Sequence, residues 1–195
     1  MAIISSSINM SRYQTDGDVS AKFSQEILDN LRRYSFLESA PEDENGEKIG
    51  WVSLDNMFIS PLDDDSFDRN GYITMSMRID KKTVSSRTLK VFLIKEEQRQ
   101  LEQSGSDKLS KTQKKDIKDA VRIKLLQQAL PTIAIYDFFW NLKGQSLYFF
   151  SLSEGVNNRF YELFSKTFKM GLIKTSPFGL AVSNGYEEKQ ILALA

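Results

Sequence analysis

Six basic side chains gather between residues 108 and 122, four of them at spacings of four, three and four residues. The four are Lys111, Lys115, Lys118 and Arg122, and Lys108 and Lys114 flank them. At about 100° per residue, an α-helix places these four along one narrow stripe. Asp116 and Asp119 fall on another face of that helix and neutralise the stripe only in part. Because exposed Lys and Arg displace condensed counterions from phosphates, the stripe predicts contact with DNA, although a solvated helix face is the ordinary alternative.

Three further cations are secondary candidates for the same basic face. Lys81 and Lys82 end a predicted strand, and Arg87 opens the next predicted helix. The chain contains neither a G-x-G-x-x-G sequence nor a P-loop, so no glycine-rich loop is expected to cradle a phosphate. Any phosphate contact should therefore come from side-chain charge.

A cluster of carboxylates offers a second kind of chemistry. Its members precede Asn70-Gly71 and are Asp63, Asp64, Asp65 and Asp68. The segment resembles a calcium loop around Gly71, but Ser66 occupies its first ligand position, and Met77 occupies the last, where a bidentate Glu is required. An acidic surface loop is the simpler interpretation, and a Mg²⁺-dependent nuclease that uses Asp63, Asp65 and Asp68 is the third hypothesis, after DNA binding and protein interaction.

The missing residue types exclude most other chemistry. The chain has no His and no Cys. It can therefore build no Ser-His-Asp triad, no thiolate nucleophile and no Cys-ligated zinc site. We expect a binding protein that is not an enzyme, with no cofactor and no metal.

Aromatic residues could serve as platforms on which bases stack. The candidates are Trp51, Tyr136, Phe138, Phe139 and Trp140. They stand in otherwise apolar strands, so a core position is favoured for them.

Periodicity and turn signals predict the elements that carry these residues. Strands are expected at 4–10, 48–52, 72–79, 132–140, 147–151 and within 172–182, with Asn70-Gly71 as a tight turn. Helices are expected at 19–35, from Ser85 or Ser86 to about 103, over about 110–130 until Pro131 ends it, and from Ser153 until Gly171 stops it. The expected class is α+β, with small antiparallel sheets packed against helices in the order β-α-β-β-α-α-β-β-α-β.

Length and charge describe the chain as a whole. Its 195 residues suit a single domain over 1–195, with two weakly repeated halves, 1–83 and 131–182, joined by a helical pair at 85–130. Residues 1–70 carry a net charge of −8 and residues 71–124 a net charge of +7. This asymmetry favours a polyanionic partner or charge-driven self-association. No signal peptide and no apolar stretch of about 20 residues is apparent, so a cytoplasmic protein without a membrane partner is expected.

The order of motifs resembles the bacterial recombination-associated protein RdgC family. The similar segments are Lys48-Ile-Gly-Trp-Val52, Lys95-Glu96-Glu97, the basic run from Lys108 to Val121, the Leu-Leu-Gln-Gln-Ala-Leu-Pro131 ending, the Trp140 strand with its turn, and Leu31 to Phe36. Family members are longer, with a further region after the position of Ala181, and they usually place Arg and an aromatic residue soon after the helix-ending Pro. Here Thr132-Ile133-Ala134 follows Pro131.

The resemblance implies a function of the same class. RdgC proteins bind DNA with little sequence preference, form ring-shaped dimers around duplex DNA and restrain recombinase-driven strand exchange. It therefore implies a non-catalytic, nucleoid-associated, dimeric protein whose lysine stripe contacts DNA phosphates. A protein-interaction module that has kept the fold and lost DNA binding is the alternative.

Overall fold

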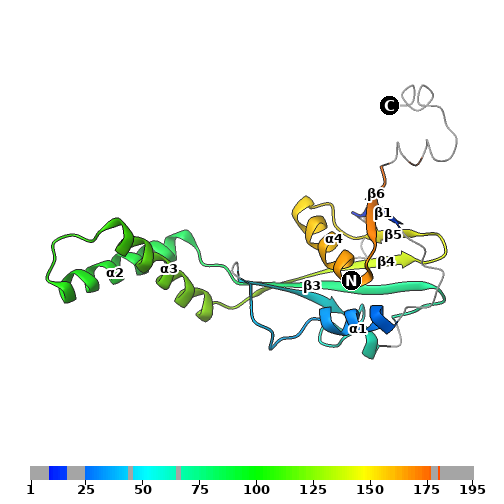
Figure 1. Ribbon diagram of the computed structural model, residues 1–195, viewed down its shortest axis with the longest axis horizontal. Helices are drawn as coiled ribbons and strands as arrows, with labels where there is room; N and C mark the ends of the chain where they lie inside the picture. Colours follow the sequence, from blue (N-terminus) through cyan, green and yellow to red (C-terminus); the bar gives the residue numbers. More distant parts are fainter. Residues whose placement is uncertain (1–8, 17–24, 44–45, 65–66, 177–179, 181–195) are drawn as a thin grey trace, which may run out of the picture. The chain divides into compact units, whose positions relative to one another are not determined.

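The chain forms an α+β structure of four helices and six strands, seen in a computed structural model that describes residues 9–16, 25–43, 46–64, 67–176 and 180. Element order agrees with the prediction (Figure 1). The strands are β1 (Ser11–Asp16), β2 (Glu47–Val52), β3 (Tyr72–Lys81), β4 (Thr132–Asn141), β5 (Ser146–Phe149) and β6 (Gly171–Lys174). The helices are α1 (Gln25–Tyr34), α2 (Ser86–Ser104), α3 (Lys111–Gln128) and α4 (Glu154–Phe168), and a 3-10 turn covers Pro61–Asp63.

The structure divides into two compact units. The sheet unit comprises Met1–Ala40, Ile49–Arg78 and Ala134–Ala195, and the helical unit comprises Pro41–Lys48 and Ile79–Ile133. The predicted helical pair at 85–130 belongs to the helical unit, and both outer parts of the chain contribute to the sheet unit.

All six strands belong to one sheet with the order β2-β3-β4-β5-β1-β6. The β1–β5, β1–β6 and β4–β5 pairs are antiparallel. Strand β1 lies between β5 and β6. The first described strand is therefore hydrogen-bonded on both sides by the last two strands of the chain. Strands of both predicted halves thus share one sheet, where the sequence suggested small separate ones.

An aromatic core joins this sheet to α4. Phe160 stacks on Phe149 with ring centroids 4.0 Å apart, and it meets Phe138 edge-on at 5.1 Å. Trp140 meets Phe164 and Phe168 of α4, each at 5.1 Å. Trp51, Phe138 and Trp140 have no exposed surface, which confirms the core position predicted for them, and Tyr136 and Phe139 are half-buried.

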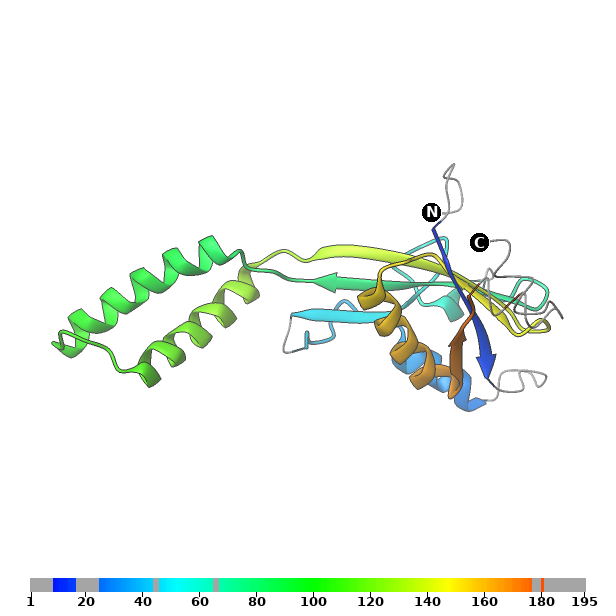
Figure 2. The same ribbon diagram turned by 90° about the horizontal axis from the view of Figure 1, so that it is seen from above.

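Helix α1 lies beside α4 on the same side of the sheet (Figure 2). Asn30 Nδ2 donates to the Thr167 carbonyl at 3.1 Å, and the Trp51 indole donates to the Thr167 hydroxyl at 2.8 Å. Gly50 lets β2 approach the chain after α1, because a Cβ at this position would lie 2.6 Å from the Phe36 nitrogen. The Gly in Lys48-Ile-Gly-Trp-Val52 is therefore set by close packing.

Both faces of β3 are covered within the sheet unit. Ile73, Met75 and Met77 form the buried apolar face that their alternation predicts. Arg78 is also buried, on the opposite face. Its guanidinium lies 4.2 Å from the Phe36 ring centroid, and it donates to the Met57 carbonyl at 3.2 Å. Cation–π contact and hydrogen bonding offset the cost of burying this charge.

Two boundaries differ from the prediction, and parts of two predicted elements lie outside the described residues. Helix α4 ends at Phe168, Lys169 caps it with a left-handed φ of 57°, and Gly171 already belongs to β6. The first described strand is Ser11–Asp16, whereas the predicted one, at 4–10, lies mostly outside the described residues. Residues 19–24 of the first predicted helix and those beyond 176, except 180, lie outside them too. Asn70 and Gly71 both have positive φ, as the predicted tight turn requires.

Within the described residues, no helix combines the length and the apolarity that crossing a membrane requires.

Candidate nucleic-acid interface

The candidate interface is carried by α3, whose start and end follow from its sequence. The Ser110 hydroxyl accepts from the Gln113 backbone N–H at 3.2 Å, and the Gln113 side chain accepts from the Ser110 N–H at 2.9 Å. This reciprocal pair is a capping box, which satisfies two donors that the first turn would otherwise leave unpaired. The helix ends at Gln128, two residues before Leu130-Pro131.

Helix α2 pairs with α3 inside the helical unit and fixes which face of α3 is outward (Figure 2). It begins at a Ser85 cap, as predicted, and ends at Gly105, which has a φ of 61°. Val121 is the buried residue of α3 and Ile117 is half-buried, and a groove between the helices runs past both. At 100° per residue the lysine stripe lies away from this contact face.

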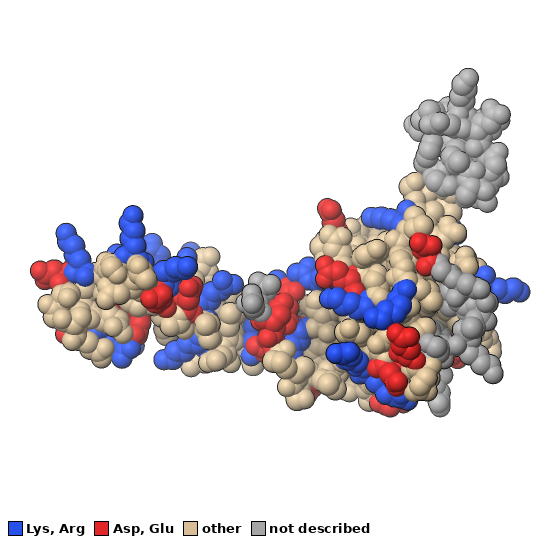
Figure 3. All heavy atoms as spheres, in the orientation of Figure 1, with Lys and Arg blue, Asp and Glu red and all other residues tan. Residues whose placement is uncertain are grey.

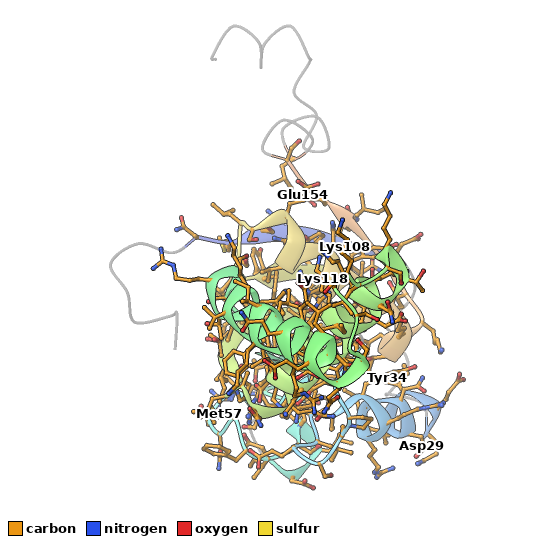
Figure 4. All side chains as sticks on the ribbon, turned by 90° about the vertical axis from the view of Figure 1, so that its left-hand side faces the viewer. Asp29, Tyr34, Met57, Lys108, Lys118 and Glu154 are labelled. Atoms are coloured by element: carbon orange, nitrogen blue, oxygen red, sulfur yellow. The ribbon has the colours of Figure 1, made fainter. Side chains whose placement is uncertain are left out.

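Every predicted primary contact is exposed. The six are Lys108, Lys111, Lys114, Lys115, Lys118 and Arg122. Ion pairs among the described residues include none of them. Figure 4 looks along the helical pair and labels Lys108 and Lys118, and Figure 3 shows Lys and Arg projecting from its edges, with Asp and Glu among them. The structure therefore brings together the cations that the spacing put on one stripe.

One carboxylate of the helical pair engages a cation outside the stripe. Glu96 of α2 is paired with Arg99 of the same helix, with 2.5 Å between Oε1 and Nη2. The hydrogen bond from Arg99 lowers the pKa of Glu96, and the same contact raises the pKa of Arg99. Asp116 and Asp119 are both exposed. At 100° per residue Asp116 points away from the stripe, whereas Asp119, four residues after Lys115, borders it without an ion pair among the described residues.

The secondary candidates behave differently from the stripe. Lys81 Nζ lies 2.5 Å from Glu47 Oε1, and Lys82 Nζ lies 2.9 Å from Glu42 Oε1. Arg87 is exposed in the first turn of α2. The sequence carries no local signal that marks Glu42 and Glu47 as partners of these lysines. The only hint was the opposite charge of the two segments.

In the carboxylate cluster before Asn70, two of the described side chains accept hydrogen bonds from nearby residues. The Asp68 carboxylate accepts from the Gly71 N–H at 3.0 Å, which stabilises the turn, and the Asp64 carboxylate accepts from the Ser53 hydroxyl. Asp63 is exposed in the 3-10 turn, and Asp65 lies outside the described residues. Among the described residues, no group of three or more His, Cys, Asp or Glu side chains is placed to hold a metal ion.

Comparison with known proteins identifies the family. A family model described as "Putative exonuclease, RdgC" matches residues 8–183 of the 195. The chain belongs to the RdgC family. No curated protein matches it. The match spans the sheet strands, α1, α4 and the whole helical pair, so the RdgC-family assignment covers the candidate interface as well as the core.

Proposed function

We propose that this RdgC-family chain is a non-catalytic DNA-binding protein that contacts the phosphate backbone with little sequence preference and acts in DNA recombination. The observation that supports it is the set of six exposed cations on α3 and just before it, none of which is paired with a described carboxylate. Contacts to phosphates supply affinity and position but no sequence choice. A stripe of Lys and Arg therefore suits binding without a preferred site.

The test is a DNA titration at two salt concentrations. Binding of unrelated duplexes with similar affinity, weakening steeply between 50 and 200 mM salt, is the expected result. No binding at 50 mM salt would refute the proposal. The same protein, incubated with end-labelled DNA and Mg²⁺, should leave the substrate intact. Shortening of the label would instead support the nuclease that uses Asp63, Asp65 and Asp68.

Exposed apolar side chains in the helical unit favour self-association as a second candidate function. Val91 is 61% exposed, Ile94 48% and Ile123 57%, and Leu130 is 90% exposed. Exposed apolar side chains that form a contiguous patch are common where proteins associate. Sedimentation velocity at low and high salt separates the causes, since pairing of the −8 and +7 segments weakens with salt and apolar pairing persists. A monomer at all concentrations and salts would exclude both the interaction module and the predicted homodimer.

A further inference from the structure

The chain contains a short acidic segment that is held against two of its own lysines. It runs from Pro41 to Lys48 and belongs to the same unit as α2 and α3. The Gly46 carbonyl accepts from the Lys82 N–H at 2.9 Å, and the Asp43 carboxylate accepts from the Glu47 N–H at 2.8 Å. Gly46 has a φ of 76°, and a Cβ there would lie 3.2 Å from the Lys82 carbonyl oxygen. The backbone thus fixes the segment beside Lys82.

Two ion pairs follow from this placement. The Lys82 side chain is 17% exposed and its partner Glu42 is 28% exposed. The Glu47 side chain is 7% exposed, and that of Lys81 is 45% exposed. Charge pairs that are partly removed from water are screened less by salt than fully exposed ones. The two lysines therefore hold their carboxylates more firmly than a surface pair on a single helix would.

The helical unit consequently contains two classes of lysine. Those of the stripe meet no described carboxylate, whereas Lys81 and Lys82 each already have one. A phosphate oxygen and a carboxylate oxygen are acceptors for the same ammonium group, so DNA phosphate competes with Glu42 and Glu47 for these lysines.

We propose that Glu42 and Glu47 are intramolecular competitors for DNA phosphate and reduce the number of phosphate contacts that this chain makes. This inference rests on the proposed DNA-binding function. Because of this competition, the affinity for DNA and its dependence on salt are both lower than they would be if Lys81 and Lys82 also contacted phosphates. Release of the segment from Lys81 and Lys82 is then the step that tightens binding.

The test is a cycle of variants measured by DNA binding as a function of salt. Glu42→Gln with Glu47→Gln removes the competing charges and keeps side-chain size. The slope of log affinity against log salt should steepen by about two units, one for each lysine gained. Lys81→Gln with Lys82→Gln should leave the wild-type slope unchanged. The four substitutions together should return the slope to the wild-type value.

A matched control separates competition from a general change of net charge. Glu102→Gln with Glu162→Gln alters net charge by the same amount at two exposed positions outside the segment. This control should leave the slope within about half a unit of wild type, because slope counts contacts. An unchanged slope in the Glu42/Glu47 variant, with wild-type binding still dependent on the α3 stripe, would overturn the competition and leave the proposed function standing. Absence of DNA binding by every variant would instead refute the proposed function itself.

Discussion

Replacing Lys111, Lys115 and Lys118 by Ala should flatten the salt dependence of DNA binding by a calculable amount. From Lys111 to Arg122 the stripe advances eleven residues, or about 16 Å at 1.5 Å per residue. Duplex DNA presents one charge per about 1.7 Å, so about ten phosphate charges lie along that length. The five cations of this span, with Lys108 just before it as the sixth, are therefore fewer than the phosphates along it, and each should count as one contact.

These counts give the expected numbers. At about 0.9 of a slope unit per contact, six contacts predict a fall in affinity of about 2,000-fold between 50 and 200 mM salt. With three contacts left, the same change of salt should cost about 40-fold. Ala is the best helix former, so α3 should persist in the variant, which circular dichroism would verify.

The assay is a mobility-shift or anisotropy titration at four or more salt concentrations with one duplex. The control variant replaces Lys143, Lys166 and Lys174, three exposed lysines of the sheet unit, by Ala. It changes net charge equally and should keep the wild-type slope. Equal flattening in both variants would show that binding follows net charge alone, and the assignment of contacts to α3 would be wrong.

Three other predictions concern what holds the interface and its support in place. Ser110→Ala removes the cap of α3 and should cost about 1 kcal/mol, seen as faster hydrogen exchange of the amides in its first turn; unchanged exchange would contradict the capping role. Phe160→Ala empties the centre of the aromatic core and should lower the free energy of unfolding by about 3–5 kcal/mol in urea, and a loss below about 1 kcal/mol would contradict that position. Burial raises the pKa of the Tyr13 phenol above its ordinary value of 10.0. The unfolded chain then loses this proton first, so stability is fully present below pH 10 and falls as pH rises further. Tyr13→Phe should remove that part of the alkaline loss, measured as urea midpoints at pH 8 and pH 10.5, and an identical loss in the variant would assign it to other groups.

Local sequence signals predicted the helix that carries the lysine stripe, including its start and its end. The spacing of Lys111, Lys115 and Lys118 determines their common face once the segment is helical, and the cap at Ser110 and the stop at Pro131 are encoded within a few residues of the helix ends. The alternation of Ile73, Met75 and Met77 predicted a buried face for the same reason. Such features depend on near neighbours in the chain, which a single sequence displays directly.

Features set by distant partners were not predictable in this way. Glycine is the usual residue beyond a helix end, so Gly171 looked like the stop of α4, but Lys169 takes the left-handed position and the chain enters β6 at Gly171. The pairs of Glu42 with Lys82 and Glu47 with Lys81 join residues more than thirty positions apart, and no periodicity reports such a contact. The position of β1 between β5 and β6 could not be predicted either, because the sequence of a strand does not show which other strands it pairs with.

The position of β1 has a consequence for how the protein is made. Ser11 pairs with Phe149, and its hydroxyl donates to the Ser151 carbonyl, 140 positions away. A ribosome must therefore release the whole helical unit before β1 meets either neighbour. Helices α2 and α3 contact each other within one continuous segment, so they can form before the last strands of the sheet have been synthesised. Once the residues up to Pro131 have emerged from the ribosome, the α2–α3 pair can therefore fold and expose its lysine stripe to polyanions before β4, β5 and β6 are available to complete the sheet.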